Sequence, residues 1–171
     1  MRRVSMNRRL ERTSRQTSST APLTPRESAR RQVRLQKFLV MQTKEVMTKP
    51  VLTVSRHGTL RELEHLFEAH DFNGFPVVED HQIIGIVTKF DFLKNFVFTP
   101  STAFPHYDEL MKRMVEQIMV TQVCTVHPTT PLTRVLEMMV ETRDKSFPVV
   151  DEKNRLIGII SRGDIVRALR G

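Results

Sequence analysis

The sequence lacks paired cysteines, long apolar runs and clustered metal ligands. Cys124 is the single cysteine in 171 residues, which excludes an internal disulfide and favours a reducing, cytoplasmic location. No apolar run approaches the roughly 20 residues that span a bilayer, and the N-terminus has no apolar segment of the secretory type. The six histidines are scattered, and no cysteine or carboxylate completes a metal-binding set around them. We therefore expect no membrane span and no metal site.

Acidic residues are scarce at the N-terminus. Residues 1–37 hold eleven Arg and Lys against Glu11 and Glu27 and carry a net charge of +9, so residues 38–171 carry −1. The segment is also rich in Ser and Thr and poor in large apolar side chains. Because it cannot bury enough surface to offset its ordering entropy, we predict a disordered basic tail over residues 1–40.

Three further interpretations of the tail stay open. It could contact nucleic acid or an anionic surface without sequence preference, although aromatic residues, which stack on bases, are absent before Phe38. It is also Arg- and Ser-rich and acid-poor, as organelle transit peptides are. Finally, Met41 could lie near the true start of the working domain.

Beyond the tail, the chain repeats itself. The run FPVV at residues 75–78 recurs at 147–150, and GIVT at 85–88, followed by Asp91, recurs as GIIS at 158–161, followed by Asp164. The first copy extends over about 46–96 and the second over about 118–169. Such repetition indicates one structural unit, copied. Whatever one copy binds, the other should nearly bind.

Hydrophobic patterning predicts the order β-α-β-β-α in each copy. The first copy has strands at 51–54, 75–78 and 83–87 and helices at 60–69 and 89–96, and the second has strands at 123–126, 147–150 and 156–160 and helices at 132–142 and 162–169. The fold class is therefore α+β, a mixed α/β protein. We expect a first domain over 41–97, a linker over 98–117 with a helix from Asp108 to Gln117, and a second domain over 118–171.

A hydroxyl residue precedes an aspartate by three positions at the start of the last helix of each copy: Thr88 with Asp91, and Ser161 with Asp164. The spacing is that of a capping box, which needs no ligand. The same geometry can hold a nucleotide, because a helix N-terminus favours phosphate and a carboxylate accepts hydrogen bonds from sugar hydroxyls. Lys89 and Arg162 follow the caps and could meet phosphate charge. No nucleophile–base pair accompanies them, so we expect binding and no catalysis.

The order of these motifs resembles the CBS domain, named after cystathionine β-synthase, and the pair resembles a Bateman module. The resemblance covers about 46–169 and rests on Val46-Met47-Thr48 with Ile118-Met119, on Thr53-Val54 with Thr125-Val126, on both FPVV runs and on both Gly-apolar-hydroxyl runs with their aspartates. It implies two units packed through their sheets about a pseudo-two-fold axis. Two clefts would then lie between the copies.

The resemblance also implies ligands and contacts. The clefts would take AMP, ADP, ATP or S-adenosylmethionine, with no cofactor required; Asp91 and Asp164 would contact the ribose, and the adenine would lie against residues 53–54 and 125–126. The complete set of expected contacts is Thr53, Val54, Phe75, Pro76, Thr88, Lys89, Asp91, Thr125, Val126, Phe147, Pro148, Ser161, Arg162 and Asp164. Because Phe90 stands where the second copy has Gly163, we expect unequal affinities, with the tighter cleft at Asp164.

We therefore expect a stand-alone regulatory module that senses adenosine nucleotides or metabolites, forms a homodimer and controls an unidentified protein. One alternative is a dimerisation or adaptor module that needs no ligand and acts through its apolar helices. Met138 and Val140 widen the apolar arc of one such helix to roughly 200°, at about 100° per residue. The other alternative is nucleic-acid contact through the tail.

Overall fold

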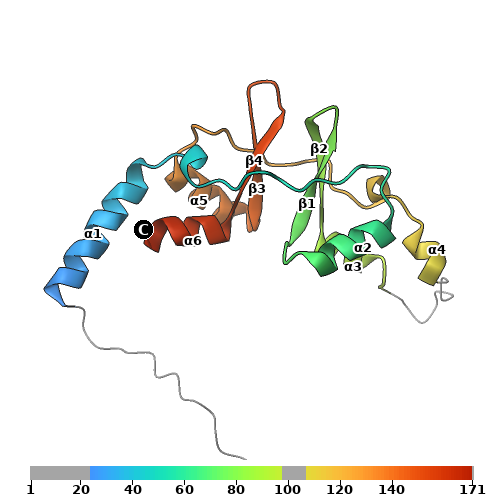
Figure 1. Ribbon diagram of the computed structural model, residues 1–171, viewed down its shortest axis with the longest axis horizontal. Coiled ribbons are helices and arrows are strands. Elements are labelled where there is room, and N and C mark those ends of the chain that lie inside the picture. Colours follow the sequence, from blue (N-terminus) through green and yellow to red (C-terminus); the bar gives the residue numbers. More distant parts are fainter. Residues whose placement is uncertain (1–23, 98–106, 171) are drawn as a thin grey trace, which may run out of the picture.

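The computed structural model describes residues 24–97 and 107–170 and has two similar halves side by side (Figure 1). The α-helices are α1 (Pro25–Val40), α2 (Leu60–Ala69), α3 (Lys89–Lys94), α4 (Tyr107–Met111), α5 (Leu132–Thr142) and α6 (Arg162–Arg170), with short 3-10 turns η1 (Thr43–Glu45) and η2 (Val115–Gln117). The strands are β1 (Gly74–Glu79), β2 (Gln82–Thr88), β3 (Ser146–Val150) and β4 (Leu156–Ser161). The expected mixed fold with a repeated unit is confirmed. No helix within these two stretches is long and apolar enough to cross a membrane.

Each half contains one antiparallel hairpin, β1 with β2 and β3 with β4. The registers match between the copies: Pro76 pairs with Ile86 and Pro148 with Ile159, and both hairpins have an irregularity within the Val-Val pair. An isolated bridge between Gln82 and Arg155 joins the hairpins near their tips. Figure 1 shows them upright at the centre, with the helices to either side.

The expected strands at 51–54 and 123–126 are wrong. Each segment meets its hairpin through one parallel bridge only, Val54 with Val77 and Val126 with Val149. The physical reason is that each segment passes from one half to the other. Six residues before Val54, Thr48 bridges Ile159 of the second half, so neither sheet can continue along the segment.

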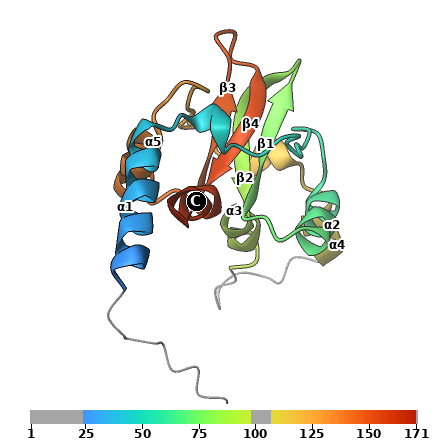
Figure 2. The same ribbon diagram turned by 60° about the vertical axis from the view of Figure 1, so that its left-hand side comes forward.

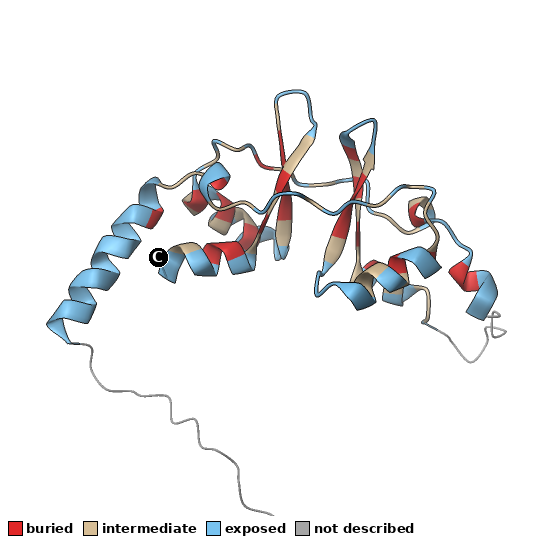
Figure 3. Cartoon of the chain, viewed as in Figure 1, coloured by how far each residue is buried: buried red, intermediate tan, exposed pale blue. Residues whose placement is uncertain are grey.

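The segment that precedes each copy completes the core of the other half. Phe38 belongs to the second core, where Met41, Val46 and Met47 pack beside it. Conversely, Met111 and Val115 belong to the first core, and Ile118 and Met119 pack against it. Figure 3 shows the buried positions of both halves along their hairpins and on the inward faces of α2 and α5. Neither half is therefore a contiguous piece of sequence.

Both motif glycines adjoin these exchanged segments. A Cβ at Gly85 would lie 2.9 Å from Sδ of Met119 and 3.1 Å from the carbonyl oxygen of Val120, and a Cβ at Gly158 would lie 2.6 Å from Sδ of Met47. Because glycine has no Cβ, each of these positions lets a segment of the other copy pack closely against the strand.

The prediction of a disordered tail over residues 1–40 is wrong for residues 25–40, which form α1. Thr24 and Glu27 form a capping box, in which the Thr24 amide donates to the Glu27 carboxylate (2.9 Å) and the Glu27 amide to Thr24 Oγ1 (3.3 Å). Pro25 occupies the first helical position, where no amide proton is needed. Phe38 is 3% exposed and attaches α1 beside α5 and α6 (Figure 2). Residues 1–23 lie outside the described residues.

The expected helix from Asp108 to Gln117 is interrupted. Its first part is α4, its last residues form η2, and residues 112–114 turn between them. The turn follows from pairing with the first half, because the Leu60 amide donates to the Arg113 carbonyl (2.9 Å) and Met114 bridges Thr59. Residues 98–106 of the expected linker lie outside the described residues.

Candidate functional site

Two clefts lie where the halves meet, and each is named here after its aspartate. The Asp91 cleft, of about 410 Å³, is lined by residues 88–91 of the first copy and by residues 122–124 and 143–148 of the second. The Asp164 cleft, of about 480 Å³, is lined by residues 161–164 of the second copy and by residues 50–52 and 71–74 of the first. Each cleft thus joins the start of the last helix of one copy to segments of the other.

Asp164 divides its carboxylate oxygens between two tasks. Oδ2 accepts hydrogen bonds from the Ser161 amide (2.6 Å) and the Ser161 hydroxyl (2.7 Å), which form the helix cap. Oδ1 accepts a weaker bond from the Thr48 hydroxyl (3.4 Å) and pairs with the Arg167 guanidinium. Asp164 is 2% exposed and lines the larger cleft. The cap therefore holds the carboxylate at the cleft wall, with Oδ1 bound by side chains that can move.

Asp91 has the same arrangement in the first copy. Oδ2 accepts from the Thr88 amide (3.1 Å) and hydroxyl (2.5 Å), and Oδ1 accepts from Lys94 Nζ (2.7 Å). Burial raises the pKa of Asp91, but the hydrogen bonds from Lys94 and Thr88 together outweigh burial and hold the pKa below its ordinary value. Asp91 is therefore a carboxylate at neutral pH, able to accept hydrogen bonds from hydroxyl groups.

The expected contacts divide into three groups. The Asp91 cleft contains Thr88, Lys89, Asp91, Phe147 and Pro148, and the Asp164 cleft contains Ser161, Arg162, Asp164 and Pro76. Neither cleft is lined by Phe75, Thr53, Val54, Thr125 or Val126. Phe75 is fully buried in the first core.

The segments expected to contact the adenine line the clefts about two residues earlier in the chain than predicted. Val54 and Val126 bond to the hairpins, through the carbonyl oxygens of Pro76 and Pro148 respectively (both 3.0 Å). The chain crosses each cleft just before that bond, so residues 51–52 and 123–124 line the clefts instead. The sequence pattern located the segment but could not indicate which residues precede the bridge.

Lys89 and Arg162, the expected phosphate contacts, are already engaged. The Arg162 guanidinium donates to the carbonyl oxygens of Asp144 (3.0 Å) and Arg143 (2.6 Å). Lys89 Nζ lies 3.7 Å from Asp71 Oδ1 and 5.8 Å from the centroid of the Phe67 ring. Both cations therefore contact other residues of the protein in this structure.

One pair that the sequence reasoning missed lies in the wall between the clefts. Lys145 Nζ donates to Asn73 Oδ1 (2.9 Å), and both residues line both clefts. They occupy equivalent positions, 72 residues apart, so the repeat offset was the signal that could have identified them. Their contact indicates that the pseudo-two-fold axis passes close to this pair.

The two clefts differ at Phe90 and Gly163, which occupy equivalent positions. Phe90 lines the smaller cleft, with Lys94 Nζ 4.7 Å from the centroid of its ring, whereas Gly163 lines the larger one. This difference has the direction expected from the sequence. The unequal affinities that we expect from it stay a prediction.

Comparisons with known proteins match this architecture. The family model of the CBS domain matches residues 44–97 and 115–171. L-aspartate semialdehyde sulfurtransferase of Methanocaldococcus jannaschii is 28% identical over 129 residues, which are 75% of this chain but 23% of that protein. The chain thus spans less than a quarter of that enzyme's length.

Two solved structures are similar over most of their length. One is the CBS domain pair of protein MJ0100 in complex with 5′-methylthioadenosine and S-adenosyl-L-methionine (TM-score 0.65, 26% identity, 77% of this chain and 98% of that one). The other is CBSX2 in complex with AMP (TM-score 0.63, 25% identity, 74% of this chain and 94% of that one). Both complexes contain a ligand with an adenosine group.

Proposed function

Because this chain belongs to the CBS domain family, we propose that it is a regulatory module that binds an adenosine-containing ligand between its two copies and has no catalytic activity of its own. The observation that carries the proposal is the buried carboxylate of Asp164. Its cap fixes Oδ2, and its Oδ1 lies in the wall of a cleft of about 480 Å³. A cleft of this size is in the usual range for small-molecule sites.

The ribose belongs at Asp164 in this proposal. Its two hydroxyl groups would donate to Oδ1 and replace the Thr48 hydroxyl and the Arg167 guanidinium, which bond that oxygen here. Such bonds to an ionised acceptor are stronger than neutral ones. The adenine would lie between Val51 and Leu52 on one side and Pro76 on the other, all of which line the cleft. The AMP and S-adenosyl-L-methionine complexes of similar structures support a ligand of this class.

Regulation would follow from the position of the site. Both copies contribute to each cleft, so a ligand bound there has a different affinity for different arrangements of the copies. By linkage, the ligand then shifts the equilibrium toward the arrangement that it binds more tightly. A protein that recognises one arrangement would be regulated in this way.

Calorimetric titration of the full chain with AMP, ATP and S-adenosylmethionine tests the proposal. Asp164→Asn keeps an acceptor for the helix cap but removes the charge, and we expect it to weaken every adenosine ligand by about tenfold or more. Thr59→Ala is the matched control, because it weakens the equivalent capping box of α2 and lies in neither cleft. If no adenosine compound releases or absorbs heat with the wild-type chain, the proposed function is wrong.

We also propose that the assembly is a homodimer formed through α5 and α6. A groove of about 330 Å³ lies between these helices, and its residues Val140, Val166 and Leu169 are 70%, 46% and 38% exposed. We expect Val140→Glu to convert dimer to monomer in sedimentation experiments. Val33→Glu, at a residue of α1 that is 65% exposed, should leave the assembly unchanged. A dimer that responds to no nucleotide would favour the adaptor alternative.

A further inference from the structure

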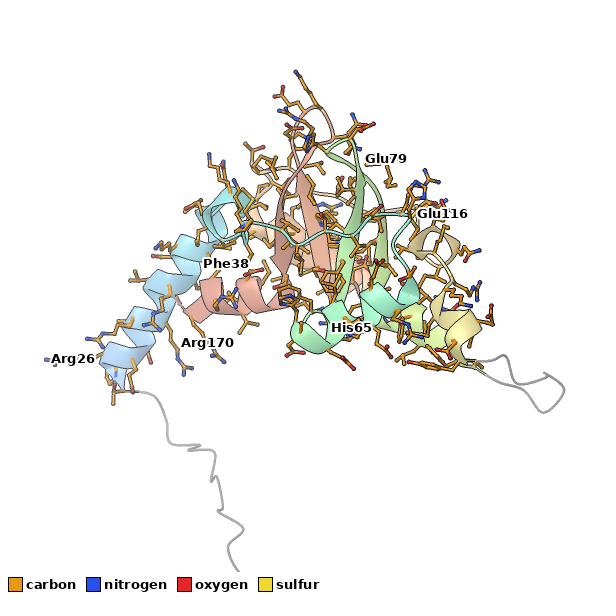
Figure 4. All side chains as sticks on the ribbon, turned by 45° about the vertical axis from the view of Figure 1, so that its right-hand side comes forward. Arg26, Phe38, His65, Glu79, Glu116 and Arg170 are labelled. Atoms are coloured by element: carbon orange, nitrogen blue, oxygen red, sulfur yellow. The ribbon has the colours of Figure 1, made fainter. Side chains whose placement is uncertain are left out.

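A third hollow, of about 270 Å³, lies between α1 and α6, and is called here the α1 hollow. Its lining contains Arg34 and Lys37 of α1 and Asp164 and Arg167 of the second copy. Arg34 and Lys37 are three residues apart and therefore share one face of α1. Phe38, adjacent to Lys37, is buried in the second core, so this face is held toward α6. Figure 4 shows Phe38 at the attached end of α1 and Arg26 at the far end.

The α1 hollow adjoins the Asp164 cleft, because Asp164 and Arg167 line both. Arg167 pairs with Asp164 Oδ1, the oxygen to which we assign the ribose. A ligand that takes over Oδ1 would release the Arg167 guanidinium. That group would then be free to pair with another part of the same ligand.

The lining of the α1 hollow is strongly basic. Three cationic side chains face one carboxylate, and that carboxylate already accepts the cap of α6. Within residues 24–97 and 107–170, neither Arg34 nor Lys37 forms a salt bridge with an acidic side chain. The excess positive charge therefore favours an anionic group in the hollow.

The first copy does not repeat this charge. α4 corresponds to the last part of α1, since Leu110 is buried 72 residues after Phe38. At the position of Lys37 it has Glu109, whose carboxylate accepts from Lys112 Nζ (2.8 Å). α4 thus has an acid at the position where α1 has a base. α1 also precedes the residues that the family model matches, so Arg34 and Lys37 lie outside the matched domain.

We propose that the α1 hollow is a subsite for the phosphate chain of a nucleoside di- or triphosphate bound in the Asp164 cleft. The proposal rests on the proposed function, because it places the ribose at Asp164. The ribose hydroxyls displace Arg167 from Oδ1, and Arg167, Arg34 and Lys37 then surround the phosphates. The Asp164 cleft accordingly prefers ATP to AMP and AMP to adenosine, whereas the Asp91 cleft has no such preference.

Calorimetry with adenosine, AMP, ADP and ATP in magnesium-free buffer tests the subsite. We expect the full wild-type chain to bind ATP about tenfold more tightly than AMP at one of its sites. In the double variant Arg34→Ala/Lys37→Ala, ATP affinity should fall by about tenfold and adenosine affinity by less than about twofold. Arg26→Ala/Arg31→Ala is the matched control: it removes the same charge from α1 at residues that do not line the hollow. Its preference for ATP should stay within about twofold of wild type.

The outcomes separate the two proposals. If adenosine compounds bind through Asp164 but the ratio of ATP to AMP affinity is the same in wild type and Arg34→Ala/Lys37→Ala, the subsite is wrong and the proposed function stands. An equal loss in the Arg26→Ala/Arg31→Ala control would also overturn the subsite, because it would reduce the effect to net charge. If no adenosine compound binds at all, the proposed function itself fails.

Thermal unfolding of both double variants checks that α1 stays attached to the second half. In a further variant, Lys37→Glu, the order of ATP and AMP affinities should be reversed.

Discussion

At the residue scale, the two aspartates show why a structural role and a binding role can coexist in one side chain. In both, Oδ2 completes the helix cap and Oδ1 bonds a cation, Lys94 or Arg167. The cap leaves the other oxygen available for a ligand, because it uses only the oxygen that faces the helix. It also orients the second oxygen, so the capping interpretation and the ligand interpretation support one another.

The lowered pKa of Asp91 predicts a pH-dependent contribution to stability. Because the folded pKa lies below the ordinary value, the contribution is complete above about pH 5 and is lost as the pH falls through the folded pKa, below 3.8. Lys94→Met should therefore lower the free energy of unfolding by about 1 kcal/mol at pH 7. The difference from wild type should shrink as the pH falls below 3.8 and vanish once Asp91 is protonated in both proteins.

Urea unfolding at a series of pH values measures this effect. Lys112→Met is the control, because Lys112 forms a similar i,i+3 pair with Glu109 in which both side chains are largely exposed. Its unfolding midpoint in urea should stay close to that of wild type at every pH, because exposed ion pairs contribute little to stability. A loss in Lys94→Met that stays constant as the pH is lowered until acid unfolds the protein would contradict the assigned role of the carboxylate.

The contrast between Phe90 and Gly163 predicts a change in ligand affinity. A Cβ at Gly163 would lie 3.5 Å from its nearest neighbours, Arg167 Nη1 and Ser161 Oγ, which is ordinary contact. Gly163→Phe should therefore leave the fold intact and weaken AMP binding in the Asp164 cleft by about tenfold through loss of space. Gly163→Ala, measured by the same titration, should bind as wild type does. Equal AMP affinity in both variants would show that size at this position does not control the cleft.

At the element scale, α1 shows what local sequence could not indicate. Within α1 the only buried side chain is Phe38. The rest of the helix is exposed and rich in arginine, lysine and polar residues, so composition predicted disorder. The helix depends on the capping box at Thr24 and on the contact of Phe38 with a core built from the second copy. A single tertiary anchor of this kind leaves almost no periodic signal in the sequence.

Replacing that anchor tests the account. Phe38→Ala should lower the free energy of unfolding by about 3 kcal/mol, because it removes a buried ring and leaves a cavity. Leu39→Ala is the neighbouring control: Leu39 is 57% exposed, so its loss should stay within about 0.5 kcal/mol. Urea unfolding measures both values, and similar losses in the two variants would mean that α1 is not attached through Phe38.

The predicted helices α2 and α5 have the bounds that the sequence indicated, residues 60–69 and 132–142. Each has strong apolar periodicity, and α2 also has a capping box at Thr59 and Glu62, so local signals sufficed. The failed strands at 51–54 and 123–126 are also apolar. Their hydrogen bonds, however, are divided between two halves, and no local pattern records such a division.

At the scale of the whole molecule, the resemblance to a CBS domain pair predicted two clefts between the copies, and the structure has them. The sequence could not predict that Thr48 would reach Asp164, a residue 116 positions later, because this contact depends on the exchange of segments between halves. The cleft residues that were missed, such as Asn73 and Lys145, also lie where the copies meet. The local sequence was thus enough to predict most elements of a single copy. It was not enough to predict how the two copies pack together.

The exchange predicts that neither half folds alone. A fragment of residues 107–171 lacks Phe38 and Met41, and a fragment of residues 1–97 lacks Met111 and Val115, all of which belong to or pack against the core of the half that remains. We expect each fragment to show no cooperative thermal transition by circular dichroism. Mixing the two should restore one, and a cooperative transition in either isolated fragment would contradict the exchange.

The exchanged segments also bear on the order of events during synthesis. A chain that emerges from the ribosome N-terminus first cannot close its first core until Val115 has emerged, and the second core, which includes both Phe38 and Ile165, must wait for the last helix. Contacts so distant in sequence are associated with slow folding, and exposed apolar surface in the interval invites aggregation. Neither half of the nascent protein can therefore be complete before about two-thirds of the chain has emerged, and the second half must wait for the last helix.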